Sequence, residues 1–367
     1  MICLLAQRSE ESERVANWPL YARRVRTLNL IAVPAWWSIS GAFIELSTNR
    51  GQILAWPRWV LLVLPLSIGI TLARILTIWT GCRIDGRHWT IRDSLRLSAW
   101  GSLASTVPML LFAVGIDALC ERDFFGVLWI GSAGVLARFA KVGFVSAEGF
   151  KPRLVKSGDL YKRSFAMAQQ MGVSLVGVFE YSTGRGRLKN AHAVSGFIGM
   201  TDVCIHYLRG PQMDFVIGHE LAHLQEKHGK KELRIAASLY LAIAILALAL
   251  PHLAIIWQVF LKFGVLLLPL LVIYAVSRRF EYAADRIAVE HTGEGEAAIR
   301  GLANLYYRTG VPTDCSALEE LFSTHPDLSR RIEAIAQIGQ VSNEVVVEIR
   351  QEYNGRSGGY GLSDAAL

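Results

Sequence analysis

Gly218-His219-Glu220-Leu221-Ala222-His223 lies past the middle of the chain and has the form H-E-x-x-H. Residues four apart on a helix share one face, so both imidazoles can bind a single Zn²⁺. Glu220 then lies beside the metal, where it can act on a bound water. Pro211 favours a helix start, and we predict a helix from Pro211 to about His228, with Gly229 at its C′ position.

A catalytic zinc site needs a third protein ligand and keeps one position open for water. Glu281 and Asp285 are again four apart, on a second predicted helix. We predict Glu281 as the third ligand and Asp285 as a hydrogen-bond partner that fixes the tautomer of a ligand histidine. The competing interpretation is an ordinary helix surface with charges at i and i+4. His228 lies off the face of His223, and we predict a solvated histidine at a helix end.

The composition indicates a membrane protein. Hydrophobic residues make up 52% of the chain and charged residues only 19%, against roughly 25% in typical globular domains. The apolar residues form blocks of about the ~20 residues that a bilayer span requires, at about 27–45, 59–80, 97–117 and 124–143. Between 235 and 277 only Lys262 is fully charged. As a helix this stretch measures roughly 64 Å, which suits two crossings.

About six transmembrane helices follow from these blocks, and they divide the chain into regions. Residues 1–146 are an N-terminal membrane region with about four spans, and 235–277 are a transmembrane hairpin inserted into the catalytic domain. Residues 147–234 and 278–350 form that domain. Residues 351–367 contain four glycines, and we predict a disordered tail.

Basic residues lie at the edges of the apolar blocks, as the positive-inside rule describes. Residues 1–26 hold five Lys or Arg and 83–96 hold four, whereas 45–58 hold two and 117–123 hold one. A cytoplasmic N-terminus satisfies this bias and leaves both polar blocks in the cytoplasm. The net charge of +7 therefore indicates membrane topology and not a nucleic-acid partner. The five cysteines are widely spaced without a C-x-x-C pair, which favours reduced thiols.

The first polar block predicts a small sheet. A helix over 157–171 has Ser157 as its N-cap, and strands are predicted over 173–181, 190–199 and 202–208.

With these motifs in order, the chain resembles the HtpX and CAAX prenyl protease family of integral-membrane zinc metalloproteases, the gluzincins. The matching stretches are 219–223, 281–285 after a hairpin, and Ser323-Thr-His-Pro-Asp-Leu-Ser-Arg-Arg-Ile332. The resemblance implies a mostly α membrane protein with a zincin-like α+β catalytic domain and one Zn²⁺ per chain. Four N-terminal spans are more than the pair usual in HtpX-like members.

The resemblance also implies roles for further residues. Glu220 serves as the catalytic base, and His325 and Arg331 help to stabilise an oxyanion. Arg331 is preferred to Arg330 on spacing alone, and the competing interpretation is a helix start at His325-Pro326 with a surface arginine. The family element at Asn190, Ala191, His192 and Ala193 implies an edge strand that pairs with an extended substrate.

The expected protein is therefore a zinc endopeptidase of the cell (inner) membrane, with its catalytic domain facing the cytoplasm. Its partners are protein or peptide substrates and the lipid bilayer, without nucleic acid. Two alternatives stay open at this stage. One is a CAAX-type processing protease for a specific lipidated client, and the other is a non-catalytic membrane scaffold with a structural metal site.

Overall fold

The computed structural model describes residues 107–120, 123–147, 151–182, 190–208, 210–249, 255–309 and 316–357, with isolated positions between 90 and 100. The chain divides into two compact units. The first comprises residues 1–23, 149–232 and 274–367, and the second comprises 24–148 and 233–273. The predicted spans at 27–45 and 59–80 lie outside the described residues.

The second unit consists of helices. Helices α5 (Val107–Cys120) and α6 (Gly126–Ala147) pack closely, because Gly115 and Gly126 lack the Cβ atoms that would meet the opposite helix. Helices α10 (His228–Ala249) and α11 (Ile255–Thr292) have residues in both units. Within the described ranges, no helix combines the length and the apolar character needed to cross a bilayer.

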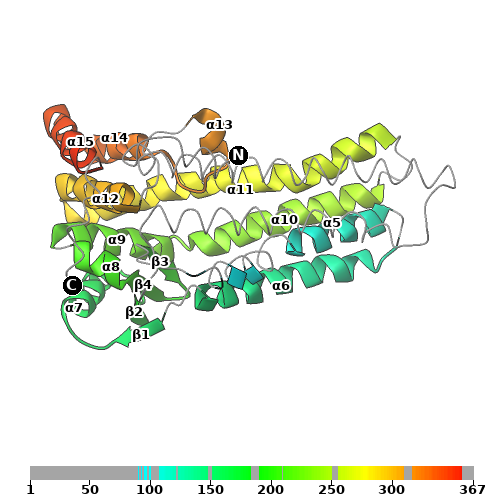
Figure 1. Cartoon of the computed structure of the whole chain (residues 1–367), viewed down its shortest axis with the longest axis horizontal. Helices are drawn as coiled ribbons and strands as arrows, with labels where there is room; N and C mark the ends of the chain where they lie inside the picture. Colours follow the sequence, from blue (N-terminus) through cyan, green and yellow to red (C-terminus); the bar gives the residue numbers. More distant parts are fainter. Residues whose placement is uncertain are drawn as a thin grey trace. The chain divides into compact units, whose positions relative to one another are not determined.

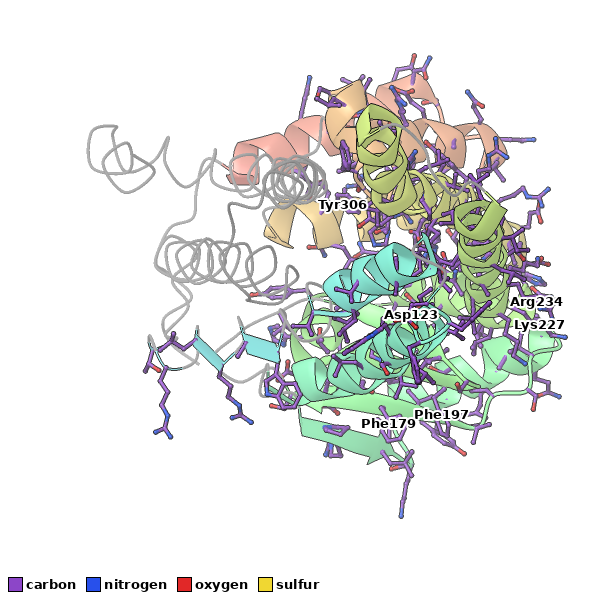
Figure 2. The ribbon with its side chains drawn as sticks, turned by 90° about the vertical axis from the view of Figure 1, so that its right-hand side faces the viewer. Asp123, Phe179, Phe197, Lys227, Arg234 and Tyr306 are labelled. Atoms are coloured by element: carbon purple, nitrogen blue, oxygen red, sulfur yellow. The ribbon has the colours of Figure 1, made fainter. Side chains whose placement is uncertain are left out.

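A four-stranded mixed sheet belongs to the first unit. Its strands are β1 (Lys151–Val155), β2 (Gly177–Ser182), β3 (Ala191–Val194) and β4 (Phe197–Thr201), in the order β1-β2-β4-β3. Strands β2 and β4 are parallel, and the two outer pairings are antiparallel. Among the described strands β3 is therefore at an edge of the sheet, and it contains Ala191–Ala193 of the stretch for which the family resemblance implies an edge strand. The rings of Phe179 and Phe197 lie next to each other on neighbouring strands, with centroids 5.4 Å apart (Figure 2).

The predicted strand over 190–199 is a hairpin, β3 and β4, that turns at Ser195 and Gly196 with positive φ at both. The predicted strand over 202–208 is wrong, because these residues form helix α8 (Asp202–Tyr207). The Thr201 Oγ1 accepts a hydrogen bond from the Cys204 N–H and caps this helix.

The helices of the first unit also differ from prediction at their ends. Helix α7 (Asp159–Gln170) begins after Gly158, whose φ of 97° supplies the entry turn, and Ser157 is not the N-cap. Helix α12 spans Gly295–Thr309, α13 Ala317–Leu321, α14 Leu328–Ile338 and α15 Asn343–Ser357. Residues 351–357 are thus helical and not part of a disordered tail, because Tyr353 is buried and donates its hydroxyl to the Arg300 carbonyl. Residues 358–367 lie outside the described residues.

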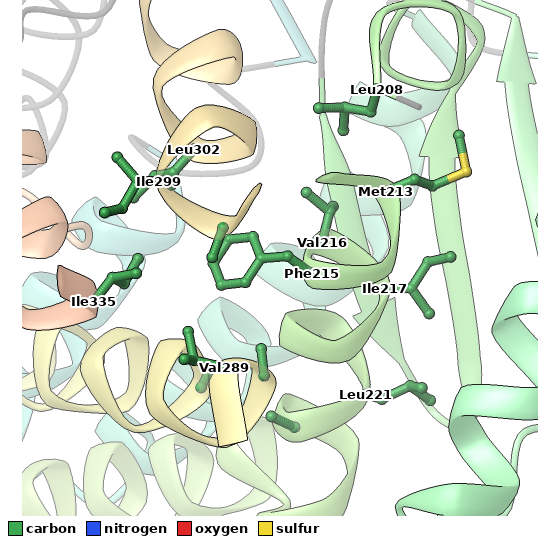
Figure 3. Close-up of a cluster of buried hydrophobic side chains, with 14 of the residues drawn as sticks. Leu208, Met213, Phe215, Val216, Ile217, Leu221, Val289, Ile299, Leu302 and Ile335 are labelled. Atoms are coloured by element: carbon green, nitrogen blue, oxygen red, sulfur yellow. The ribbon is translucent and has the colours of Figure 1, made fainter. Parts of the chain in front are cut away.

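Helix α9 (Pro211–Gln225) carries the H-E-x-x-H motif and lies between the sheet and α12 (Figure 1). Phe215 points from it toward Val289 and Ile299, whereas Ile217 and Leu221 point away on the other side (Figure 3). Because α9 is buried on both sides, its position is fixed by the core of the first unit.

Close contact between α9 and α11 places the H-E-x-x-H motif of α9 beside Glu281 and Asp285 of α11. An added Cβ at Gly218 would lie 3.4 Å from the Ala288 Cβ, so the small residues let the two helix backbones approach closely. Gly218 directly precedes His219, and Ala288 lies two turns after Glu281. The contact therefore brings the motif histidines to the acidic stretch of α11.

The predicted helix from Pro211 to His228 is wrong at its end. Helix α9 ends at Gln225, Lys227 adopts a left-handed conformation with φ of 54°, and α10 begins at His228. Gly229 lies inside α10 and is not a C′ residue. A lysine is not a residue type that favours this conformation, so the sequence carries no local signal for the break.

Candidate active site

Three side chains converge from α9 and α11. The Nε2 atoms of His219 and His223 are 3.2 Å apart. The Glu281 carboxylate lies 3.7 Å from the His219 Nε2 through Oε2 and 3.5 Å from the His223 Nε2 through Oε1. One ligand atom from each residue lies within 4.8 Å of the others, and Glu281 is only 7% exposed.

This triad fits a tetrahedral metal ion. Zinc–nitrogen bonds of ~2.0–2.1 Å at a tetrahedral angle separate two ligand atoms by about 3.3 Å, close to the observed spacings. Both Nδ1 atoms have other hydrogen-bond partners, so the two Nε2 lone pairs face one region together with a carboxylate. The buried Glu281 Oε2 also has no hydrogen-bond partner of good geometry. A cation among these atoms would satisfy all three groups.

Asp285 lies one turn after Glu281 and orients His219. The His219 Nδ1 lies 2.9 Å from the Asp285 Oδ1, at hydrogen-bond distance. Asp285 is 1% exposed, and it also accepts hydrogen bonds from Nε and Nη2 of Arg331 at 2.8 and 2.7 Å. With the ionised carboxylate as acceptor, His219 carries its proton on Nδ1 and presents a free Nε2.

Arg331 and Arg330 differ sharply in their surroundings. Arg331 is 4% exposed, and its Nη1 donates to the Tyr306 hydroxyl at 3.2 Å and lies 3.2 Å from the Glu281 Oε2. Arg330 is exposed and forms an ion pair with Glu320 at 2.6 Å. The structure thus brings Arg331, and not Arg330, to the motif residues.

His325 lies in the loop between α13 and α14, beside Glu281. Its Nδ1 is 2.9 Å from the Glu281 Oε2, and 58% of its side chain is exposed. Arg278 holds this loop, because its Nη1 donates to the carbonyls of Glu320 and Ser323 at 2.8 and 2.7 Å. The Ser323 hydroxyl in turn donates to the His325 carbonyl at 2.7 Å.

The charged groups perturb one another strongly. Burial raises the pKa of Glu220, and the neighbouring histidines only partly oppose this rise. Burial also acts to raise the pKa of Glu281, but the attraction of His325 and Arg331 holds it well below its usual range. The pKa of Asp285 is lowered in the same way: burial opposes the shift, and Arg331 and His219 outweigh it. Glu281 and Asp285 are therefore anionic at neutral pH, as a metal ligand and its supporting acceptor must be.

The stretch Asn190–Ala193 lies at the sheet edge. Ala191, His192 and Ala193 are in β3, which packs against α9, and Asn190 directly precedes it. The Asn190 N–H donates to the Thr201 Oγ1 at 3.1 Å. The His192 ring lies over β4 beside Tyr181, with ring centroids 5.1 Å apart.

His228 is the site residue that the sequence prediction missed. It is not a solvated histidine, because it is 3% exposed, and its Nδ1 lies 2.9 Å from the Nδ1 of His223. Its ring stacks on Phe280 with centroids 4.2 Å apart and planes 7° apart. Burial, with the charges of His223 and Lys231, lowers the pKa of His228 to about 4. On an unbroken helix His228 would point away from His223. The contact forms because the chain turns at Lys227, and the sequence did not predict this turn.

Comparisons with known proteins find similarity over the part of the chain that contains the site. Residues 156–338 match the model of peptidase family M48, and this range contains every site residue described above. A protein named "Protease HtpX homolog" from Streptococcus uberis is 26% identical over 174 residues, which cover 38% of this chain and 58% of that protein. The match thus spans less than two thirds of the relative's length.

A solved structure has a similar fold. The crystal structure of S. mikatae Ste24p matches with a TM-score of 0.56 and 19% sequence identity, and the match covers 82% of this chain and 80% of that one.

Proposed function

Because the chain belongs to the HtpX and CAAX protease family within peptidase family M48, we propose that it is an integral-membrane zinc endopeptidase that cleaves membrane or misfolded proteins. The observation that carries this proposal is the convergence of His219, His223 and Glu281 with Glu220 between the two histidines in sequence. Three ligands leave one position of a tetrahedral site for water, which is the arrangement of catalytic rather than structural zinc.

Each residue of the site has a part in the proposed hydrolysis. His219, His223 and Glu281 would hold one Zn²⁺, which supplies Lewis-acid activation of water and of the scissile carbonyl. Glu220 accepts the proton of the attacking water and later delivers it to the leaving amine. Its raised pKa makes this carboxylate a stronger base than a solvated glutamate. Asp285 holds His219 in the tautomer that binds the metal.

We assign the stabilisation of the oxyanion to His325 and Arg331, which act in two different ways. His325 is exposed beside Glu281, so its imidazole can reach a substrate oxygen directly. Arg331 directs its nitrogens to Asp285, Tyr306 and Glu281, so it contributes the positive charge of a buried guanidinium and not a direct hydrogen bond.

The substrate would bind as an added strand. Strand β3 has a neighbour on one side only in the described sheet, and it packs against α9, which carries the motif. An extended peptide pairing with Ala191–Val194 would be held mainly through its backbone, which allows many sequences to be cleaved. This loose recognition suits a protease of damaged proteins.

We place the protein in the cell (inner) membrane as a multi-pass protein with its catalytic domain in the cytoplasm. The apolar blocks and the distribution of basic residues along the sequence support this placement. About six spans, four of them before residue 147, account for these blocks.

A CAAX-type processing protease is the second candidate. The family resemblance of the sequence motifs suggests it, and the chain shares the fold of Ste24p at 19% identity. A processing enzyme requires the lipidated carboxyl terminus of its client, whereas a general endopeptidase cleaves unfolded proteins without it. A non-catalytic scaffold is disfavoured, because a structural zinc site has four protein ligands and the described site offers three.

The Glu220→Gln variant tests the proposal. It keeps the size of the side chain and removes the base, so we expect one zinc per chain to remain while cleavage of casein and of a membrane substrate falls by at least roughly 10²-fold. Zinc content is measured by elemental analysis on the purified full chain in detergent. A variant that cleaves at the wild-type rate refutes the assignment of Glu220, and a wild-type chain without stoichiometric zinc refutes the metal site.

A further inference from the structure

We infer that His228 is a positioning residue for His223, and that it acts as a neutral imidazole acceptor for the His223 Nδ1–H group. This inference rests on the proposed function, because it concerns how His223 is prepared to bind the metal. Three observations carry the inference: the 2.9 Å contact between the two Nδ1 atoms, the burial of His228 and the stacking of its ring.

Proton counting fixes the roles of the two rings. If His223 binds the metal through Nε2, its proton is on Nδ1 and must be donated to an acceptor. The atom at hydrogen-bond distance is the Nδ1 of His228. This nitrogen can accept only if the proton of the neutral His228 ring is on Nε2. The geometry therefore specifies opposite tautomers for two neighbouring histidines.

Packing holds the accepting ring in place. His228 is 3% exposed and lies parallel to Phe280, with ring centroids 4.2 Å apart. Phe280 directly precedes the proposed ligand Glu281 on α11. The same helix thus presents one metal ligand and supports the group that orients another.

The left-handed turn explains how His228 reaches its position. Lys227, with φ of 54°, ends α9 and lets α10 begin in a new direction. His228 is the first residue of α10, and the reversal returns its ring to His223, five residues earlier. The turn therefore has a function in the site besides joining two helices.

The two histidine ligands are oriented by different chemistry. His219 donates to the Asp285 carboxylate, whose charge is balanced by two hydrogen bonds from Arg331. His223 donates to an uncharged ring. A carboxylate in the position of the His228 ring would add a second buried negative charge, and among the described residues no arginine lies there to balance it as Arg331 balances Asp285. A neutral acceptor orients the ligand without this cost.

Two substitutions at His228 separate positioning from packing. His228→Asn places a carbonyl oxygen near the position of Nδ1 and removes the stacked ring. His228→Phe keeps an aromatic ring against Phe280 and removes the acceptor. The full chain is purified in detergent, and its Zn²⁺ and Co²⁺ dissociation constants are measured by competition with a chelator of known affinity.

We expect His228→Phe to weaken metal binding by roughly 10–100-fold, the usual effect of removing a partner of a ligand histidine. We expect His228→Asn to stay within a few-fold of the wild type. The inverse pattern, in which His228→Asn weakens metal binding and His228→Phe does not, shows that the ring serves packing alone and overturns the inference. Wild-type affinity in both variants overturns it as well.

A measurement on the unsubstituted chain covers the case in which a variant does not fold. In the zinc-loaded protein with ¹⁵N-labelled histidine, we expect His223 to be protonated on Nδ1 and His228 on Nε2. A proton on the Nδ1 of His228 overturns the inference. Failure of the proposed function is distinct, since the wild-type chain would then bind no stoichiometric zinc or the Glu220→Gln variant would remain active.

Discussion

Replacing Arg331 by Met should destabilise the first unit strongly. Arg331 and Asp285 are 4% and 1% exposed, and two hydrogen bonds of 2.7 and 2.8 Å join them. Methionine keeps much of the side-chain volume but leaves Asp285 and Glu281 without their arginine. Removing one partner of a buried ion pair costs about 3–5 kcal/mol.

This free energy converts to a shift in melting temperature. In a unit of roughly 200 residues, 1 kcal/mol lowers Tm by about 2–4 °C, so we expect a decrease of about 6–20 °C. The measurement is made on metal-free protein with chelator present, so that weaker zinc binding does not contribute.

The reporter can be Cys204, a buried residue of α8 in the first unit. A thiol-reactive dye labels it when that unit unfolds, provided that the other four cysteines are replaced by serine: Cys3, Cys82, Cys120 and Cys315. Tryptophan fluorescence is a poor reporter of this unit, since nine of the ten tryptophans in the sequence belong to the second unit and only Trp18 belongs to the first.

A double-mutant cycle identifies the cause. Adding Asp285→Asn to Arg331→Met removes one stranded charge, so we expect the double variant to be less destabilised than the sum of the single variants. A decrease of less than about 2 °C for Arg331→Met, or strict additivity, would refute the argument from an uncompensated buried carboxylate.

Two further substitutions test the loop and the turn. Arg278→Ala removes the hydrogen bonds to the carbonyls of Glu320 and Ser323, so we expect kcat to fall roughly 10–100-fold while zinc affinity stays unchanged. The control is Arg279→Ala at the exposed neighbouring position, which should leave kcat unchanged. Equal kcat for the two variants would contradict this role of Arg278. Lys227→Gly removes the strain of a lysine in the left-handed conformation, so the free energy of unfolding should stay unchanged or rise by up to about 1 kcal/mol. Lys230→Gly in the first turn of α10 should instead lower it, by up to about 1 kcal/mol. The dye melt distinguishes these results, and a large loss for Lys227→Gly would show that its side chain is needed.

The parts of the site that follow from local periodicity could be predicted. His219 and His223, and Glu281 and Asp285, are each four apart on helices, and the structure places all four together. The family resemblance is confirmed, and a small sheet is present. Family spacing alone favoured Arg331 over Arg330, and the physical difference between the two is the burial of Arg331, which depends on how α14 packs against α11.

The errors share a physical origin in single capping residues and turns. Thr201 caps α8 where a strand was predicted over 202–208, and Lys227 breaks a helix without glycine or proline. That break is why His228 could not be placed from spacing. Tertiary contacts determine the local structure at these residues, and the periodicity of the sequence does not report tertiary contacts.

Helix α15 bears on how far the carboxyl end of this protein can be shortened. Trimming the glycine-rich end at residue 351, as composition alone would recommend, would cut through a helix whose Tyr353 is buried and whose Glu352 receives a 2.6 Å hydrogen bond from Arg300. Arg300 belongs to α12, which packs directly on α9. The last helical turns thus stabilise, through one intermediate helix, the segment that carries His219 and His223. A shortened chain should therefore keep α15 whole, from Asn343 to Ser357.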